Sequence, residues 1–220
     1  MLNICNLTKS YPRRGTVLDS INLFVNSGDT VAVTGPSGSG KSTLLNLIGL
    51  LDRPDSGEII FMDRKINGFD SNEAASYRNI NIGFVFQDHL LLPHLTIGEN
   101  ILLPLLAGKK GIDTHDRDYL SELGEETGIS HLLGKMPSEV SGGEAQRAAL
   151  LRALINRPSI ILADEPTGSL DLQNAGVIAS LFVKMNKKSG TTFITVTHSA
   201  LLAEKMSIHF RLESGHLIEY

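Results

Sequence analysis

The chain has 220 residues, of which 41% are hydrophobic and 20% charged, and its formal net charge is −4 at pH 7. This composition is typical of a globular protein, and the negative charge gives no general basic field, so we expect no nucleic-acid partner. The one cysteine, Cys5, excludes an internal disulfide and fits a reducing compartment. We expect no secretory leader at the start, and no run of 18 or more apolar residues predicts a membrane span.

Strand and helix patterns alternate along most of the chain. Residues 88–158 instead predict helix after helix, one of them opening at Thr96 with Glu99 three residues later, which is a capping box. Strands alternating with helices indicate an α/β fold with a parallel sheet, into which 88–158 is inserted as a helical block. We predict strands at 2–7, 17–25, 29–35, 58–62, 81–87, 159–164, 191–198, 208–212 and 216–220, and helices at 42–51 and near 173–188, with a further short helix before the last two strands.

The stretch "GPSGSGKST", Gly35 to Thr43, matches the phosphate-binding loop pattern. Its glycines allow backbone amides to point at phosphate oxygens, Lys41 adds a full positive charge, and Ser42 is placed to ligate Mg²⁺. A simple glycine turn is the alternative, but the strand before and the helix after match the required context. The loop predicts a nucleotide site made of Gly35, Pro36, Ser37, Gly38, Ser39, Gly40, Lys41, Ser42 and Thr43.

The stretch "IILADEP", Ile160 to Pro166, is an apolar strand that ends in two acids. On its own this pattern is weak, because a solvated strand end often carries acids. Beside a phosphate-binding loop, however, Asp164 is placed to hold Mg²⁺ and Glu165 to act as general base on an attacking water.

The stretch "VSGGEAQR", residues 140–147, puts two glycines where a helix has to begin. Glycine is about 1 kcal/mol worse than alanine in a helix, so the pair needs a reason. A phosphate-binding loop, then this stretch, then "ILADEP", resembles the ATP-binding-cassette (ABC) ATPase family over about residues 2 to 219. The resemblance implies that this stretch is the family's signature motif, and that its Ser141, Gly142 and Gly143 face the γ-phosphate of an ATP held by a second subunit.

The resemblance also assigns roles to four residues that carry no signal alone. Tyr11 matches the aromatic ring that stacks on adenine, and Gln87 matches the glutamine that touches Mg²⁺ and the attacking water. Asp171, in "GSLD", matches the loop that crosses the dimer seam, and His198 matches the histidine that contacts the γ-phosphate. Without the resemblance, Tyr11 would more often be a surface tyrosine, Gln87 would carry no meaning, and His198 would be a solvated histidine at a strand end.

The resemblance implies ATP and Mg²⁺ as ligands, a homodimer that encloses two ATP, and a transmembrane permease that contacts residues around 88–108. It implies a peripheral location on the cytoplasmic face of the inner membrane. The fold that it implies is an α/β P-loop NTPase core with an antiparallel β subdomain and a helical insertion. Residues 1–87 and 159–220 are then the ATP-binding core, and 88–158 is the helical subdomain that carries the signature motif. Alternatively, the leucines of 88–108 fill the core of the insertion, and we expect this for most of them.

Within the family, the sequence in and around these motifs is similar to that of the bacterial lipoprotein-releasing and macrolide- or peptide-export ATPases. The cell-division ATPase and a non-transport ABC ATPase stay open as alternatives, as does a regulatory clamp without hydrolysis, against which Glu165 argues. Glu144 departs from the usual glutamine of the signature. It completes a capping box with Ser141, and its charge is expected to be mildly unfavourable if it points at phosphate.

Overall fold

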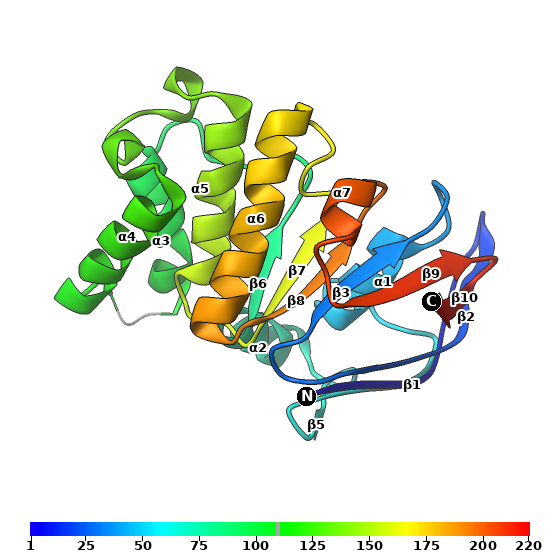
Figure 1. Ribbon diagram of the computed structural model, residues 1–220. Helices are drawn as coiled ribbons and strands as arrows, with labels where there is room; N and C mark the ends of the chain where they lie inside the picture. The colour runs from blue at the N-terminus through cyan, green and yellow to red at the C-terminus, as the bar shows by residue number, and fades with distance from the viewer. Residues whose placement is uncertain (109–110) are drawn as a thin grey trace.

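The computed structural model describes residues 1–108 and 111–220, and Figure 1 shows their arrangement as two sheets with helices packed on them. The strands are β1 (Leu2–Tyr11), β2 (Gly15–Val25), β3 (Thr30–Thr34), β4 (Ser56–Phe61), β5 (Arg64–Lys65), β6 (Ile82–Val85), β7 (Ile160–Asp164), β8 (Thr192–Val196), β9 (Ile208–Glu213) and β10 (His216–Glu219). The α-helices are α1 (Lys41–Ile48), α2 (Ser71–Asn81), α3 (Ile97–Ala107), α4 (Thr114–Thr127), α5 (Gly142–Leu154), α6 (Leu172–Ser189) and α7 (Ala200–Ala203).

The larger sheet has the strand order β10-β9-β3-β8-β7-β6, and all neighbours except β10 and β9 run parallel. This confirms the α/β fold class. Val196 of β8 pairs with Val33 of β3 on one side and with Asp164 of β7 on the other. The register therefore brings the segment after β3 and the acidic end of β7 to the same edge of the sheet.

The smaller sheet is antiparallel, in the order β2-β1-β4-β5. Side chains alternate between its two faces, and one face is buried. The buried face packs with α1 and one side of the larger sheet in a single apolar cluster. Leu7, Leu18 and Phe61 are almost completely buried there. The antiparallel sheet therefore packs against β3 and α1, the strand and helix that flank the phosphate-binding loop.

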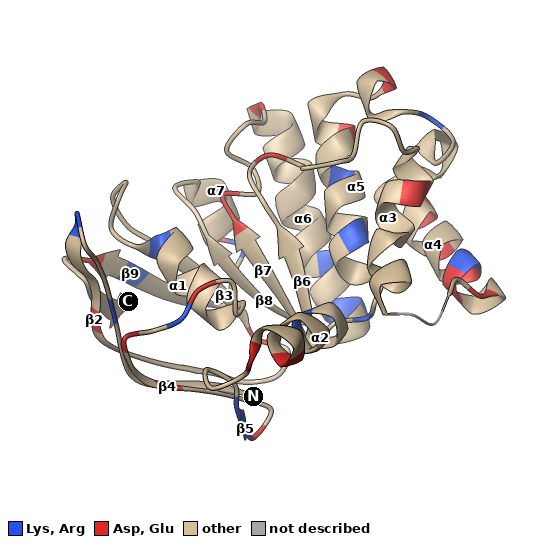
Figure 2. Cartoon of the chain, turned by 180° about the vertical axis from the view of Figure 1, so that it is seen from behind, with Lys and Arg blue, Asp and Glu red and all other residues tan. Residues whose placement is uncertain are grey.

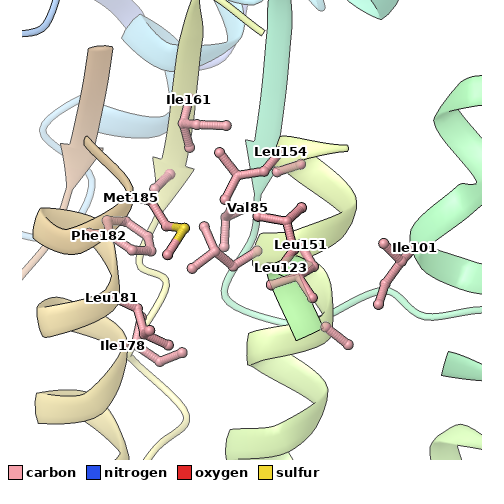
Figure 3. Packing of buried hydrophobic residues seen from close by; sticks show 14 of the residues in the cluster. Val85, Ile101, Leu123, Leu151, Leu154, Ile161, Ile178, Leu181, Phe182 and Met185 are labelled. Atoms are coloured by element: carbon pink, nitrogen blue, oxygen red, sulfur yellow. The ribbon is translucent and has the colours of Figure 1, made fainter. Parts of the chain in front are cut away.

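Helices α3, α4 and α5 form the helical region, which Figure 1 shows to one side of the larger sheet, beside α6. Their apolar side chains join the other face of that sheet in a second cluster. Figure 3 shows Phe182 and Met185 of α6 directed towards Val85, Leu151 and Leu154. This packing sets the position of the start of α5 relative to α6.

The observed elements differ from the expected ones at their ends, and two of them, α2 and β5, were not expected. Strand β1 continues to Tyr11, whereas α1 ends at Ile48 and β6 at Val85, earlier than expected. Helix α5 begins at Gly142, so both signature glycines lie inside it, and α6 begins at Leu172. Helix α2 was not predicted, because Ala74 is its only buried residue and it lacks an apolar stripe. The capping box formed by Asp70 and Glu73 was the available sequence signal.

Charged residues of both signs are distributed over the sheets and the helices, as Figure 2 shows. Across the described ranges, no helix combines the length and the apolar character that a membrane span requires.

Candidate ATP-binding site

The phosphate-binding loop joins β3 to α1, as expected. Gly35, Gly38 and Gly40 have φ angles of 146°, 78° and 105°, a region that side chains rarely adopt. Space also requires glycine, because a Cβ on Gly35 would lie 2.2 Å from the carbonyl oxygen of Leu212. The loop can therefore turn its amides inward, just ahead of the positive N-terminus of α1.

Lys41 begins α1 and is only 6% exposed. Its Nζ donates to the carbonyl oxygens of Gly35 and Pro36 at 3.0 and 3.1 Å and lies 3.1 Å from Nε2 of His198. Burial lowers the pKa of Lys41, and the carboxylate of Glu165 opposes that shift. A cation held in this way against the loop is available to phosphate oxygens.

Ser42 and Asp164 meet at the base of the loop, where Oγ of Ser42 donates to Oδ1 of Asp164 at 3.1 Å. Burial raises the pKa of Asp164, the hydrogen bond from Ser42 lowers it, and the charge of Glu165 raises it further. A hydroxyl and a carboxylate this close form a hard oxygen donor set of the kind that suits Mg²⁺.

Glu165 follows β7 in a left-handed backbone conformation, with φ of 46°. Its Oε2 accepts a hydrogen bond from the backbone N–H of His198 at 3.0 Å, and its Oε1 lies 3.4 Å from Nε2 of the same residue. Oε1 is buried, and within the described part of the chain it has no hydrogen-bond partner. The strained conformation and the unpaired acceptor are features expected where a carboxylate serves chemistry.

Lys41, Ser42, Glu165 and His198 line a cavity of about 590 Å³, whereas Asp164 lies behind Ser42, outside the lining. Gln87, at the end of the segment after β6, lines it next to Gly168, and the carbonyl oxygen of Gln87 accepts a hydrogen bond from Ser169 at 3.2 Å. The lining residues are Arg14, Val17, Ser37, Gly38, Gly40, Lys41, Ser42, Thr43, Gln87, Glu165, Gly168 and His198. Arg14 and Val17 were missed, although the basic pair "RR" after Tyr11 was a usable signal.

Tyr11 lies at the end of β1 and does not line this cavity. Its hydroxyl donates to Oδ2 of Asp52 at 2.7 Å, and Nζ of Lys9 stands 5.0 Å from its ring centroid. Lys9 also pairs with Oδ1 of Asp52 at 2.9 Å. Burial and the hydrogen bond to Asp52 raise the pKa of Tyr11. The ring is therefore held in one orientation before any ligand binds.

Ser141 is the N-cap of α5, and with Glu144 it forms the expected capping box. Ser141 and Gly142 are exposed, whereas Gly143 is buried. None of the signature residues lines the cavity that contains Lys41. Asp171 is likewise outside it, as the N-cap of α6, where it holds Asn174. The expected site residues thus fall into two separate groups on one chain.

Comparison with known proteins agrees with this geometry. The sequence profile of the ABC transporter family matches residues 18–168. The lipoprotein-releasing system ATP-binding protein LolD 1 of Rhodopirellula baltica is 45% identical, over 99% of this chain and 96% of its own length. The LolD protein of Myxococcus xanthus is 42% identical, over 100% of this chain and 99% of its own length. A dimeric post-hydrolysis structure of the ATP-binding cassette MJ0796, bound to ADP and Pi, superimposes with a TM-score of 0.90 at 38% identity, over 100% of this chain and 98% of that chain.

The fold and the phosphate-binding loop define the class of this protein, an ATP-binding cassette. The chain belongs to the ABC transporter family, as its ATP-binding, ATP-hydrolysing component. The resemblance inferred from the three motifs is confirmed.

Proposed function

We propose that this chain binds ATP with its phosphates in the loop Gly35–Thr43 and hydrolyses it with Glu165 as general base. The hydrogen bond from His198 N–H holds Oε2 of Glu165, so Oε1 is left to accept a proton from water. His198 and Gln87 face the same cavity, where they can contact the γ-phosphate and the attacking water. Ser37, Ser39 and Thr43 complete the phosphate cradle in this proposal.

Mg²⁺ fits the donor set at the base of the loop. Ser42 and Asp164 supply two oxygens 3.1 Å apart, and Ser42 and Gln87 both line the cavity. When bound, the ion would neutralise charge on the β- and γ-phosphates. Oγ of Ser42 and the carboxylate of Asp164 are the groups that would hold the ion.

The adenine base is assigned to Tyr11. The hydrogen bond to Asp52 leaves the ring with one fixed orientation, which lowers the entropy cost of stacking a base on it. Arg14 extends the cavity lining towards β1 and is placed for the ribose or α-phosphate.

The active unit in this proposal is a homodimer that encloses two ATP. The observation that carries it is the separation of the two groups of site residues, since Ser141 and Gly142 present an exposed helix N-terminus away from the cavity of their own chain. The amides at such an end lack intrahelical partners and attract phosphate. The similar cassette MJ0796 is described as dimeric. Asp171 lies beside this helix end, where the proposed homodimer needs a loop that crosses the interface between its two chains.

The concentration dependence of the ATPase rate tests this assembly. If each site needs two chains, turnover per chain rises with chain concentration until the dimer saturates. A Ser141→Ala variant should need a higher concentration to reach half of its maximum, because its helix end holds the second chain's ATP more weakly. Turnover per chain that stays constant over a thousandfold dilution would contradict the composite site.

The free energy of ATP binding and hydrolysis is assigned to driving a membrane partner. This partner docks in a groove of about 430 Å³ between α2, β6, α3 and α5. The expectation that most leucines of 88–108 fill the core of the helical region is wrong. Of the eight leucines, only Leu91 and Leu102 are buried, and Leu90, Leu92 and Leu106 are exposed. The groove itself is lined by Leu51, Ala75, Arg78, Asn79, Ile82, Gly83, Phe84, Phe86, Pro104, Ala107, Arg152, Ala153 and Asn156.

The chemistry of this groove suits a short apolar helix. The rings of Phe84 and Phe86 stack with their centroids 5.6 Å apart. Nη1 of Arg152 donates to the carbonyl oxygen of Leu90 and Nη2 to that of His89, so both terminal nitrogens of the guanidinium are occupied. Gln87 follows directly on Phe86, so the occupant of the groove would touch the segment that reaches the ATP cavity. Residues 88–158 then act as the helical subdomain that couples the partner to residues 1–87 and 159–220.

Two variants test the groove. Ala107 is exposed at its edge, and Ala107→Glu places a charge in it. Phe24→Glu is the control, since Phe24 is 61% exposed on β2, away from the groove. We expect Ala107→Glu to lower the fraction of the chain that sediments with membranes of cells expressing its partner, with ATP-dependent dimerisation intact. Equal sedimentation of both variants would contradict this docking site.

By its similarity to the LolD proteins, the transporter is assigned to lipoprotein release, with the chain bound peripherally to the cytoplasmic face of the inner membrane through its partner. Release of radiolabelled lipoproteins from partner-containing vesicles, on addition of Mg-ATP, is the corresponding assay. Lipoproteins that stay in the vesicles while ATP is hydrolysed would point to another cargo.

A further inference from the structure

Gly143 has no backbone reason to be glycine. It lies inside α5 and is absent from the positions with positive φ among the described residues. It is also buried in the single chain, without ATP or a second subunit. Alanine is the better helix former, so something within the chain must exclude a side chain here.

Asn174 of α6 occupies the space. An ideal Cβ on Gly143 would lie 2.4 Å from Oδ1, 2.7 Å from Cγ and 3.2 Å from Cβ of Asn174. The first two contacts are far below van der Waals separation. The third involves the root of the side chain, which a change of rotamer leaves in place.

The amide of Asn174 is not free to turn away. Its Nδ2 donates to Oδ2 of Asp171 at 2.8 Å, and its backbone N–H donates to Oδ1 at 2.8 Å. One residue thus occupies both carboxylate oxygens of Asp171. Turning the side chain away from Gly143 breaks the bond through Nδ2.

Gly142 has different surroundings. It is exposed, and a Cβ there would meet only Cδ2 of Leu170, at the ordinary distance of 3.9 Å. The contacts within this chain therefore require a glycine at 143 and tolerate a side chain at 142.

We propose that Asn174 is a positioning residue that locks the start of α5 to Asp171, and that Gly143 is glycine because of Asn174 rather than because of ATP. This inference rests on the proposed role of the signature in binding a second chain's ATP. A side chain at 143 pushes the N-termini of α5 and α6 apart. Ser141 and the helix-end amides then miss the phosphate, and Asp171 moves with Asn174.

Thermal unfolding of the nucleotide-free chain tests the contact itself. Gly143→Ala should lower the melting temperature by at least about 3 °C, because the added methyl overpacks the α5–α6 contact. In an Asn174→Ala background the same change should lower the melting temperature by less than about 1 °C, because the contacts with Oδ1 and Cγ are gone and only the 3.2 Å contact with Cβ of residue 174 opposes the helix propensity of alanine. Asn174→Ala keeps the backbone bond to Asp171, so α6 retains its N-cap. Gly142→Ala is the matched control and should not lower the melting temperature.

The functional readout is ATP-dependent dimerisation, measured in a Glu165→Gln background that retains ATP. Gly143→Ala should weaken dimerisation at least tenfold, and the Gly143→Ala/Asn174→Ala pair should return to within about threefold of Asn174→Ala alone. If the pair stays as weak as Gly143→Ala, ATP or the second chain requires the glycine and the proposal is wrong. A Gly143→Ala chain with unchanged melting and dimerisation would also overturn it. If the Glu165→Gln chain with Gly143 and Asn174 unchanged does not dimerise with ATP at all, the proposed function fails. The melting temperatures would still test the contact between Gly143 and Asn174.

Discussion

The hydroxyl of Ser141 donates to Oε2 of Glu144 at 2.8 Å, and the backbone N–H of Ser141 donates to the same oxygen at 2.7 Å. One carboxylate oxygen therefore holds the serine that is proposed to face a second chain's γ-phosphate. These hydrogen bonds from Ser141 lower the pKa of Glu144, so the charge is present at neutral pH. The residue that departs from the usual signature both stabilises the helix and adds a negative charge beside the phosphate position.

Glu144→Gln should therefore tighten the ATP-dependent dimer by about threefold, because the amide oxygen can still accept both hydrogen bonds while the repulsion is removed. The melting temperature should fall by about 1–2 °C through loss of the charge at the helix N-terminus. Equilibrium sedimentation with Mg-ATP, in the Glu165→Gln background, measures the dimer.

The matched control for this change is Glu99→Gln. Glu99 caps Thr96 at the start of α3 with the same hydrogen bonds, at 2.8 and 2.9 Å, and is outside the ATP cavity. It should show the same fall in melting temperature with an unchanged dimer constant. A dimer that weakens in Glu144→Gln would show that the carboxylate helps to bind the second chain.

The base assignment predicts that Glu165→Gln lowers the ATPase rate by at least about a hundredfold. Glutamine can still accept the hydrogen bond from His198 N–H, so the fold and ATP affinity should be retained. Steady-state turnover with a parallel nucleotide-binding titration separates the two effects. Retention of more than a tenth of wild-type turnover would remove Glu165 from the role of base.

Asp52 provides a prediction about stability and pH. Burial alone would raise its pKa, but the hydrogen bonds from Lys9 and Tyr11 outweigh that effect and hold the pKa below its usual value. A carboxylate with a depressed pKa contributes stability above its unfolded pKa and loses that contribution as pH falls through the folded value. Asp52→Asn should cost about 1–2 kcal/mol in urea unfolding at pH 7, and progressively less as the pH is lowered through the folded pKa of Asp52.

The same change should raise the KM for ATP without changing kcat, because Tyr11 loses the acceptor that orients its ring. Tyr11→Phe removes the hydroxyl and is the partner for a double-mutant cycle. In a Tyr11→Phe chain, Asp52→Asn should leave the KM unaltered. An equal KM effect in both backgrounds would mean that Asp52 acts through Lys9 instead.

Much of the fold and the phosphate cradle could be predicted, because they depend on local sequence. The glycines of 35–40, the strand before them and the capping boxes at Thr96 and Ser141 follow from backbone geometry and hydrogen bonding within a few residues. Helix α2 was missed because it buries so little apolar surface that only its cap marks it.

Contacts between residues far apart in the chain could not be predicted. The sequence gives no sign that Asp52 holds Tyr11, that Asn174 fills the space beside Gly143, or that Glu165 adopts a positive φ. The first depends on how the end of β1 packs beside the segment after α1. The other two depend on the packing of α5 against α6 and on the register of β7 and β8, which only the assembled core determines.

Size-exclusion chromatography with light scattering on the Glu165→Gln variant tests the composite ATP site most directly. With Mg-ATP the mass should rise from 23.8 kDa to twice that value, and addition of Ser141→Ala should lower the dimer fraction at the same concentration. A chain that binds ATP at its phosphate-binding loop yet stays at 23.8 kDa at every concentration would contradict the account.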